Sequence, residues 1–318
     1  MTSAPGAGVD ADVDVVVVAH ASRDTLRSCI APLAGAPGIR VIVVDTASAD
    51  PAFDTVEDLD GVDLVHAERN GGFAYGCNLG AARGRARYVL FLNPDAAMRP
   101  EQLALLVAVL DGDPGIGLVA PRVVDEDGVL QRSVRRFPRL RSAVSKALFL
   151  HRIVPNAAWS DDLVHDPAAY QRAWDPEWVS GACMLVRRDA LEALGGLDEG
   201  FFMYAEDTDL SWRLWARGLR VRFEPAAEVV HVGGHSAPRS QLRTADVRSH
   251  VRYVLVRDGA GAARAAALAT ALDELTHLVV RARRPGYARG HWAGLRAALA
   301  AAWSPERCAR LAGRSPFG

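Results

Sequence analysis

The stretch "GGLDEGFFMYAEDTDLSWRLWARG", residues 195–218, places carboxylates directly against aromatic residues. Asp198 and Glu199 precede "FFMY", and Glu206 and Asp207 follow it after one alanine. A solvated acidic turn needs no aromatic neighbours, whereas burial beside aromatic rings raises the proton affinity of a carboxylate. Such a carboxylate suits the transfer of a proton or the binding of a cation. This stretch is therefore the first candidate for a catalytic site.

Further polar residues end two segments that have the composition of buried strands. Asp45 ends "RVIVVD", and Asn93 and Asp95 end "RYVLFLNPD". A carboxylate beside the rigid Pro94 can face a hard cation such as Mg²⁺ or Mn²⁺, with phosphate oxygens and water as the other ligands. Asp45 can accept hydrogen bonds from a base or a ribose. Taken alone, each acid fits an ordinary turn or helix cap equally well.

Two glycine-containing segments add candidates. "NGGFAYGCNLG", residues 70–80, would let the backbone approach a phosphate or a sugar closely. It has neither the GK[ST] of a P-loop nor the GxGxxG spacing of a dinucleotide site, so a simple tight turn is the competing interpretation. "VVHVGGHS" places His231 at the end of a strand. Its imidazole could join a carboxylate on a metal, or it could be purely structural.

The hydrophobic pattern indicates the elements that position these residues. Buried strands such as 13–19 and 40–45 alternate with helical segments, which is typical of an α/β protein with a mainly parallel sheet. Ligands of such sheets bind at the carboxyl ends of the strands, where Asp45 and Asp95 are expected. Residues 220–236 predict a strand, a turn and a second strand. Glu206 and Asp207 are expected on the loop before a helix that ends at Gly218.

Composition excludes several classes of protein. The four cysteines form no CxxC pair, so neither a zinc site nor a disulfide framework is indicated. Residues 1–11 lack the regions of a signal peptide and are expected to be a disordered lead. No uninterrupted run of about 18 apolar residues predicts a spanning helix. These features favour a cytoplasmic protein.

Charge divides the chain unevenly. Residues 239–318 contain fourteen arginines, no lysine and five acids, a net charge of +9 against −10 for the rest. A basic, Ala/Arg-rich helical extension on an acidic body fits an enzyme that touches an anionic membrane, here at the inner face of the plasma membrane. A solvated helical face is the alternative. Because the body is acidic, no nucleic-acid partner is expected.

The order of these pieces is more informative than any one of them. The series "VVVVAH", "VVDTASAD", "NGGFAYGCNLG", "FLNPDA", "SGACMLVRR", "GGLDEGFFMYAEDTDLSWR" and "VVHVGGHS" resembles the family-2 inverting glycosyltransferases of the GT-A fold, and most closely their bacterial rhamnosyltransferase-like branch. The resemblance covers about residues 12–236. It implies a Rossmann-like, mixed but mainly parallel sheet with helices on both faces over 12–238. An irregular insertion at about 131–178 and a helical extension over 239–318 complete the chain.

The resemblance also implies roles for individual residues. Asp207 matches the catalytic base. Asp95 matches the last acid of the DxD-type motif, which binds the metal on the diphosphate, and His231 matches a histidine that completes the metal site. The positions that match nucleotide- or donor-binding residues are Ala19, His20, Asp45, Asn70, Gly71, Gly72, Asn78 and Asn93. The positions near the acceptor are Tyr204, Glu206 and Trp212.

The implied activity is a single inverting displacement. The enzyme would transfer a sugar from a nucleotide donor to a hydroxyl of a cell-envelope or lipid-linked glycan. L-Rhamnose from dTDP-rhamnose is the best single choice of sugar and donor. Mg²⁺ or Mn²⁺ would bind the diphosphate of the donor. "AHAS" and "DTAS" depart from the usual residues after the first two strands, which leaves a UDP- or GDP-sugar donor open. A non-catalytic nucleotide-sugar-binding scaffold is the alternative from another class. A nucleotidyltransferase would instead release pyrophosphate.

Overall fold

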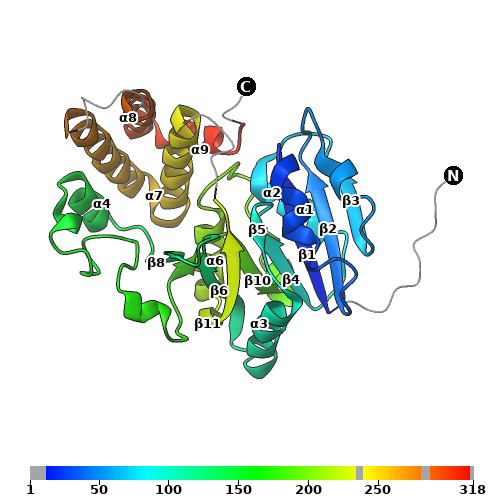
Figure 1. Ribbon diagram of the computed structural model, residues 1–318. Helices are drawn as coiled ribbons and strands as arrows, with labels where there is room; N and C mark the ends of the chain where they lie inside the picture. Colours follow the sequence, from blue (N-terminus) through cyan, green and yellow to red (C-terminus); the bar gives the residue numbers. More distant parts are fainter. Residues whose placement is uncertain (1–11, 234–238, 281–286, 316–318) are drawn as a thin grey trace.

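The computed structural model describes residues 12–233, 239–280 and 287–315, and its centre is a mixed sheet (Figure 1). The strands of this sheet are β1 (Val13–Ala19), β2 (Ile39–Asp45), β3 (Val62–His66), β4 (Tyr88–Leu92), β5 (Ala96–Ala97), β6 (Ile116–Val124), β7 (Leu130–Gln131), β10 (Cys183–Arg187) and β11 (Arg220–His231). Their order is β3-β2-β1-β4-β10-β6-β11-β5, with β7 paired to β6. The pairs β1–β2, β2–β3, β1–β4 and β6–β11 are parallel, whereas β10 runs antiparallel to both of its neighbours.

The sheet is buried on both faces, which explains why its strands are continuous hydrophobic runs. Successive residues of β1 enter different cores, because Val15 and Val17 pack into one cluster and Val16 and Val18 into the other. The first face is covered by α1 (Arg23–Ile30) and α3 (Pro100–Gly112). The second face is covered by α2 (Gly72–Ala81), α5 (Arg188–Ala193) and α6 (Glu206–Ala216).

The insertion and the C-terminal region form a second layer beside the sheet (Figure 1). The insertion contains β8 (Val134–Arg135), α4 (Leu140–Ala147), the 3₁₀ turns η2 (Leu150–Arg152) and η3 (Pro167–Tyr170), and β9 (Trp178–Val179). The C-terminal helices are α7 (Arg239–Val280), α8 (Tyr287–Trp303) and α9 (Pro305–Ala312). Gly259 kinks α7, since its φ of 84° is not helical. Phe201 packs in a cluster with Val251 and Tyr253 of α7, which ties these helices to the catalytic-site candidate.

The predicted mixed, mainly parallel sheet with a helical C-terminal region is confirmed, but three local predictions are wrong. Residues 220–231 form one strand with an irregularity between Glu224 and Glu228 where two strands were expected. The insertion is not irregular throughout, because α4 and a two-stranded sheet of β8 and β9 lie within it. Glu206 and Asp207 are in the first turn of α6 rather than on the preceding loop. The predicted lead, residues 1–11, lies outside the described residues.

Within the described ranges, no helix is long and apolar enough to cross a bilayer.

Candidate active site

The carboxyl ends of β1 and β2 bring together the first group of predicted residues. Ala19 pairs with Asp45 in the parallel register, and both are buried. Asp45 accepts a hydrogen bond from the Ser48 backbone N–H at 3.1 Å through Oδ2. Its Oδ1 is buried without a hydrogen-bond partner. A buried carboxylate oxygen is costly to leave unpaired, so this atom is available to a donor from a bound molecule.

His20 continues this edge toward the glycine-rich segment. Its Nδ1 lies 3.4 Å from both the Thr46 and the Ser48 hydroxyl oxygens. Its Nε2 lies 3.5 Å from Asn70 Nδ2. Asn93 begins directly after β4, which pairs in parallel with β1, and therefore lies at the same edge. The structure thus places Asp45, His20, Asn70 and Asn93 around one end of the sheet, where the strand pattern had predicted the ends of the second and fourth strands.

The glycines of "NGG" are needed for a close approach between two backbones. Asn70 Oδ1 accepts a hydrogen bond from Gly72 N–H at 3.1 Å, and Gly72 has a φ of 85°. A Cβ atom at Gly72 would lie 2.0 Å from the carbonyl oxygen of Phe202. The next residue, Phe73, donates its N–H to that carbonyl at 2.9 Å. This turn is therefore packed against the "FFMY" loop, and only glycine fits there.

Gly71 and Asn78, in the same glycine-rich segment, are in close contact with other residues of the protein. A Cβ atom at Gly71 would lie 2.4 Å from the Tyr75 ring. The amide of Asn78 donates to the Leu197 carbonyl at 2.9 Å and to Glu199 at 3.0 Å, and its oxygen accepts from Leu197 N–H at 2.9 Å. The Asn78 side chain therefore holds the loop before "FFMY" in place.

Asp95 and His231, which are 136 positions apart, meet at the junction of β5 and β11. His231 pairs with Ala96 in the sheet, and its Nε2 lies 3.2 Å from Asp95 Oδ1. The other imidazole nitrogen lies 3.0 Å from Gln131 Oε1, which fixes the ring orientation. Burial favours the neutral acid, but the hydrogen bond from His231, the charge interaction with His231 and a backbone hydrogen bond together outweigh burial and lower the pKa of Asp95. An anionic carboxylate and an oriented imidazole are suitable donors for Mn²⁺ or Mg²⁺.

No group of three or more His, Cys, Asp or Glu side chains that could hold a metal occurs among the described residues. A metal on Asp95 and His231 would therefore lack a third ligand of these four residue types there. Oxygens of a bound diphosphate could complete its coordination.

The loop before α6 has a strained backbone. Tyr204 and Ala205 have φ values of 69° and 67°, a left-handed conformation that is uncommon for residues other than glycine. Two contacts with the C-terminal helices hold the loop. Ser249 Oγ donates to the Met203 carbonyl at 2.7 Å, and the Phe202 N–H donates to the Ala312 carbonyl at 2.9 Å. The surrounding structure thus enforces the conformation that begins α6 at Glu206.

Asp207 is oriented by three hydrogen-bond donors. Its Oδ2 accepts from Gly181 N–H at 2.9 Å, and its Oδ1 accepts from the Thr208 N–H at 2.7 Å and the Thr208 hydroxyl at 3.3 Å. Burial raises the pKa of Asp207, although these donors favour its anion. The side chain is only partly buried and lines a cavity. An oriented, partly desolvated carboxylate at a cavity wall has the properties of a general base.

Glu206 differs from its neighbour in both exposure and charge. It is 7% exposed, and its Oε2 has no hydrogen-bond partner. Burial and the adjacent Asp207 carboxylate raise the pKa of Glu206 to about 8. Neutral Glu206 beside anionic Asp207 avoids two like charges at one site.

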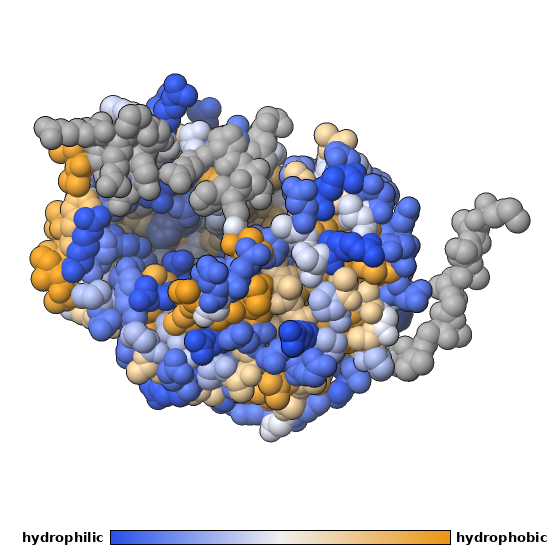
Figure 2. Space-filling model, viewed as in Figure 1, coloured by the Kyte–Doolittle hydropathy of each residue, from blue (hydrophilic) through white to orange (hydrophobic). Residues whose placement is uncertain are grey.

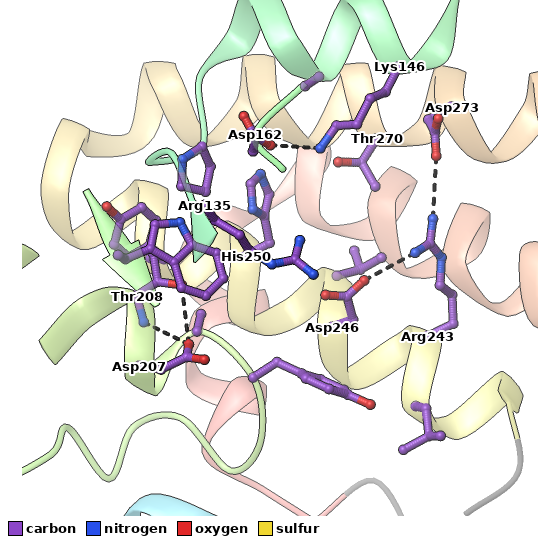
Figure 3. A pocket seen from close by; sticks show the side chains of 18 of the residues that line it. Arg135, Lys146, Asp162, Asp207, Thr208, Arg243, Asp246, His250, Thr270 and Asp273 are labelled. Carbon is purple, nitrogen blue, oxygen red and sulfur yellow. Dashed lines mark hydrogen bonds and ion pairs between the residues drawn. The ribbon is translucent and has the colours of Figure 1, made fainter. Parts of the chain in front are cut away.

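A cavity of about 920 Å³ joins Asp207 to the insertion and the C-terminal helices (Figure 3). Tyr204, Glu206, Asp207 and Thr208 line one part of it. The resemblance had implied an acceptor contact for Tyr204 and Glu206 and the role of base for Asp207. The other walls were not predicted from the sequence; they carry Arg135, Arg139, Lys146, Asp162, Trp178, Arg243, Asp246, His250 and Asp273. Only the basic, aromatic composition of the insertion pointed to this wall.

Trp212 lies elsewhere. Its side chain packs against the cluster of Phe201, Val251 and Tyr253 on the inner side of α6, and it is not among the described residues that line the cavity. The geometry gives Trp212 the surroundings of a core residue rather than those of an acceptor contact.

The chain is similar to a known family and to several known proteins. The sequence profile described as glycosyl transferase family 2 matches residues 14–195. An N-acetylglucosaminyl-diphospho-decaprenol L-rhamnosyltransferase of Mycobacterium tuberculosis is 30% identical over 263 aligned positions, covering 77% of this chain and 83% of that protein. Rhamnosyltransferase WbbL of Escherichia coli is 27% identical over 235 positions, covering 70% and 84% of the two chains.

Solved structures share the fold. The mannosyltransferase PcManGT from Pyrobaculum calidifontis, in complex with GDP-Man and Mn²⁺, matches 95% of this chain and 90% of its own, with a TM-score of 0.55 at 19% identity.

Proposed function

This chain belongs to glycosyl transferase family 2, and from that premise we propose that it transfers L-rhamnose from dTDP-rhamnose to a hydroxyl of a lipid-linked or cell-envelope glycan. The observation that carries the proposal is Asp207, a partly buried carboxylate held by three donors at the wall of a large cavity. The two rhamnosyltransferases named above support the choice of sugar.

The donor binds at the carboxyl ends of the strands in this proposal. Asp45, through its unpaired Oδ1, and His20 receive the base or ribose. Asn70, Asn93 and the backbone of Gly71 and Gly72 lie beside the sugar diphosphate. Asp95 and His231 hold Mn²⁺ or Mg²⁺, which supplies positive charge to the diphosphate when bound. Ala19 lines the base, whereas Asn78 and Trp212 are given structural roles because of their contacts.

Asp207 acts on the acceptor. One of its carboxylate oxygens accepts the proton of the acceptor hydroxyl as the hydroxyl oxygen forms a bond to the anomeric carbon. The bond between that carbon and the diphosphate breaks, and the nucleoside diphosphate leaves with the bonding electrons. The attacking oxygen and the leaving group lie on opposite sides, so the configuration inverts. The raised pKa of Asp207 strengthens it as a base, and the neutral state of Glu206 leaves that base the only charged member of the pair.

The cavity favours an acceptor with an anionic group. Three of its cations already have acidic partners, because Arg139 pairs with Glu177, Lys146 with Asp162, and Arg243 with Asp246 and Asp273. Arg135 forms no ion pair within the described residues, and its guanidinium lies 5.4 Å from the centre of the Trp178 ring. Figure 3 shows this side chain extending into the cavity. A phosphate on the acceptor would give Arg135 a partner, and a diphospho-lipid acceptor is named for the M. tuberculosis relative.

The general base is tested by Asp207→Asn. Transfer should fall by about 10²- to 10⁴-fold, because loss of a general base has that effect, while calorimetry shows unchanged nucleotide binding. Asp189→Asn, an exposed change on α5, is the matched control. If the Asp207→Asn enzyme keeps a substantial fraction of wild-type transfer, Asp207 is not the base.

The donor is tested by calorimetric titration with dTDP-rhamnose, UDP-sugars and GDP-sugars, with and without Mn²⁺. Metal-dependent binding of dTDP-rhamnose alone supports the proposed donor. If a UDP- or GDP-sugar binds more tightly, that sugar is the donor, and the proposed inverting displacement is unchanged. Binding without turnover of any supplied acceptor would favour the scaffold alternative.

We also propose that the enzyme works at the cytoplasmic face of a membrane, where residues 239–318 contact anionic lipid. The net charge of that segment supports this.

A further inference from the structure

The outward face of α7 is apolar over its last three turns. Leu268, Leu272, Leu275 and Val279 follow one another at intervals of four, three and four residues, which places them in one stripe along the helix. All four are exposed, and Val279 is 71% exposed. The exposed side of a helix in water is normally polar, because its apolar stripe faces the core. This stripe therefore lacks the partner that its composition requires.

The neighbouring helix α8 has a second stripe of a different composition. Trp292 is 56% exposed and Trp303 is 88% exposed, and Leu299 lies between them on the same face. Two exposed arginines, Arg289 and Arg296, have the spacing of this stripe. Indole rings combine a large apolar surface with one polar N–H, a combination that suits the boundary between water and lipid.

The two stripes lie on the same side of a helix pair. The α7 residues that line the cavity, such as Thr270 and His277, are roughly half a turn from the α7 stripe. Gly290 has nearly the same relation to the α8 stripe, whereas His291 is roughly a quarter turn from that stripe. The His277 and His291 rings stack at 5.3 Å. The paired helices therefore present one side to the cavity and the stripes on the other. We call Leu268, Leu272, Leu275, Val279, Trp292, Leu299 and Trp303 the C-terminal apolar face.

The insertion has exposed hydrophobic residues of its own beside α7. Leu148 and Ile153 are exposed just after α4, and the intervening Phe149 ring lies 4.9 Å from His277 on the cavity side of α7. Figure 2 shows hydrophobic side chains gathered along the left edge of the molecule, where Figure 1 places α4 and the end of α7. The apolar surface is thus wider than one helix.

The charged residues within the two stripes, Arg289 and Arg296 of α8, are positive. Neither stripe contains an acidic residue. Other arginines of the extension are used internally, because Arg243 pairs with Glu274, Arg252 with Asp198 and Arg257 with Asp258. These arginines therefore form ion pairs within α7 and with the loop before α6. The exposed surface of these helices instead carries apolar and aromatic residues, with arginines between them on α8.

We infer that the C-terminal apolar face docks on the surface of a bilayer that contains anionic lipids. Leucine, valine and tryptophan side chains would enter the boundary between headgroups and acyl chains, and the arginines would reach the phosphates with their aliphatic stems along the apolar surface. A second copy of the chain fits less well, because a twofold contact would bring arginine-bearing faces together without acids to compensate. The inference names the surface for the membrane contact proposed above, and its test does not depend on sugar transfer.

The test is flotation of the full chain with vesicles of phosphatidylcholine alone and with 30 mole per cent of added phosphatidylglycerol, about a third of the lipid. The wild-type protein should float with the anionic vesicles. Trp292→Gln/Trp303→Gln should bind about tenfold more weakly or worse, since two indoles are withdrawn from the boundary. Leu275→Gln/Val279→Gln tests the other stripe by the same measurement. Leu105→Gln, at an exposed leucine of α3, is the matched control and should float like wild type.

Several outcomes would overturn the inference. Equal flotation of both double variants and the wild type would show that another surface makes the contact. A wild type that does not float, or that binds both vesicle types equally, would refute docking on anionic lipid. If light scattering shows that the wild type is a dimer and that both double variants are monomers, the face would instead bind a second copy of the chain. Unchanged thermal melting and unchanged transfer to a lipid-free acceptor separate each of these results from misfolding and from failure of the proposed reaction.

Discussion

Glu206→Gln should make the protein more stable, and by an amount that grows with pH. The carboxylate is 7% exposed, lies beside Asp207 and leaves Oε2 without a partner. Burial and the Asp207 charge raise its pKa to about 8, from 4.5 in an unfolded chain. Between these values the folded protein holds a proton that the unfolded chain has released. The contribution of Glu206 to the free energy of unfolding is therefore fully present below pH 4.5, and it is lost as the pH rises to 8.

The slope follows from proton linkage. One proton released on unfolding lowers the free energy of unfolding by about 1.4 kcal/mol per pH unit. Glutamine has nearly the same shape as glutamic acid and does not ionise. The free energy of unfolding of the variant therefore does not fall with pH through this group. The difference in stability, variant minus wild type, should grow by about 3 kcal/mol between pH 5.5 and 7.5 and level off above pH 8.

Urea unfolding at pH 5.5, 6.5 and 7.5 measures the difference directly. Glu199→Gln, at an exposed glutamate of the preceding loop, should show no such trend. If the Glu206→Gln and wild-type stabilities run parallel across this range, Glu206 is ionised in the folded protein and the reasoning about the Glu206–Asp207 pair fails.

Two further substitutions test the donor side. Gly72→Ala should lower the free energy of unfolding by about 2–4 kcal/mol, because its Cβ would meet the Phe202 carbonyl at a left-handed φ; Gly261→Ala, where a Cβ meets open space, should not, and equal effects in urea unfolding would contradict the close approach. His231→Ala should weaken Mn²⁺-dependent nucleotide binding about tenfold in calorimetry and leave metal-free binding unchanged. An unaltered Mn²⁺ dependence would exclude His231 as a ligand.

The sequence predicted best those features that depend on local pattern. The run "VDVVVVA" predicted β1 with its bounds, because a strand buried on both faces must be hydrophobic at every position. The parallel order then put Asp45 and Asn93 at one edge, since parallel strands share their carboxyl ends. The pairing of Asp95 with His231 could be anticipated from the resemblance alone, because nothing near either residue points to the other.

Features that depend on distant contacts were missed. The direction of β10 is set by pairing with β4 and β6, which its own residues do not encode. Helix α6 begins at Glu206, directly after two residues that tertiary contacts hold in a left-handed conformation. The sequence pattern does not show these contacts, so the predicted start of the helix was too late. The far wall of the cavity joins residues such as Arg135 and His250, more than a hundred positions apart, and no local pattern relates them.

The hydrogen bonds on the "FFMY" loop limit how this enzyme can be recombined. The Phe202 carbonyl accepts from Phe73, the Phe202 N–H donates to Ala312, and the Met203 carbonyl accepts from Ser249. One short loop is therefore held by the first turn of α2, the first part of α7 and the last residue of α9. A chimera that exchanged the C-terminal helices for those of a relative would replace two of these three contacts. Grafts meant to change the acceptor should carry the loop and the helices as one unit.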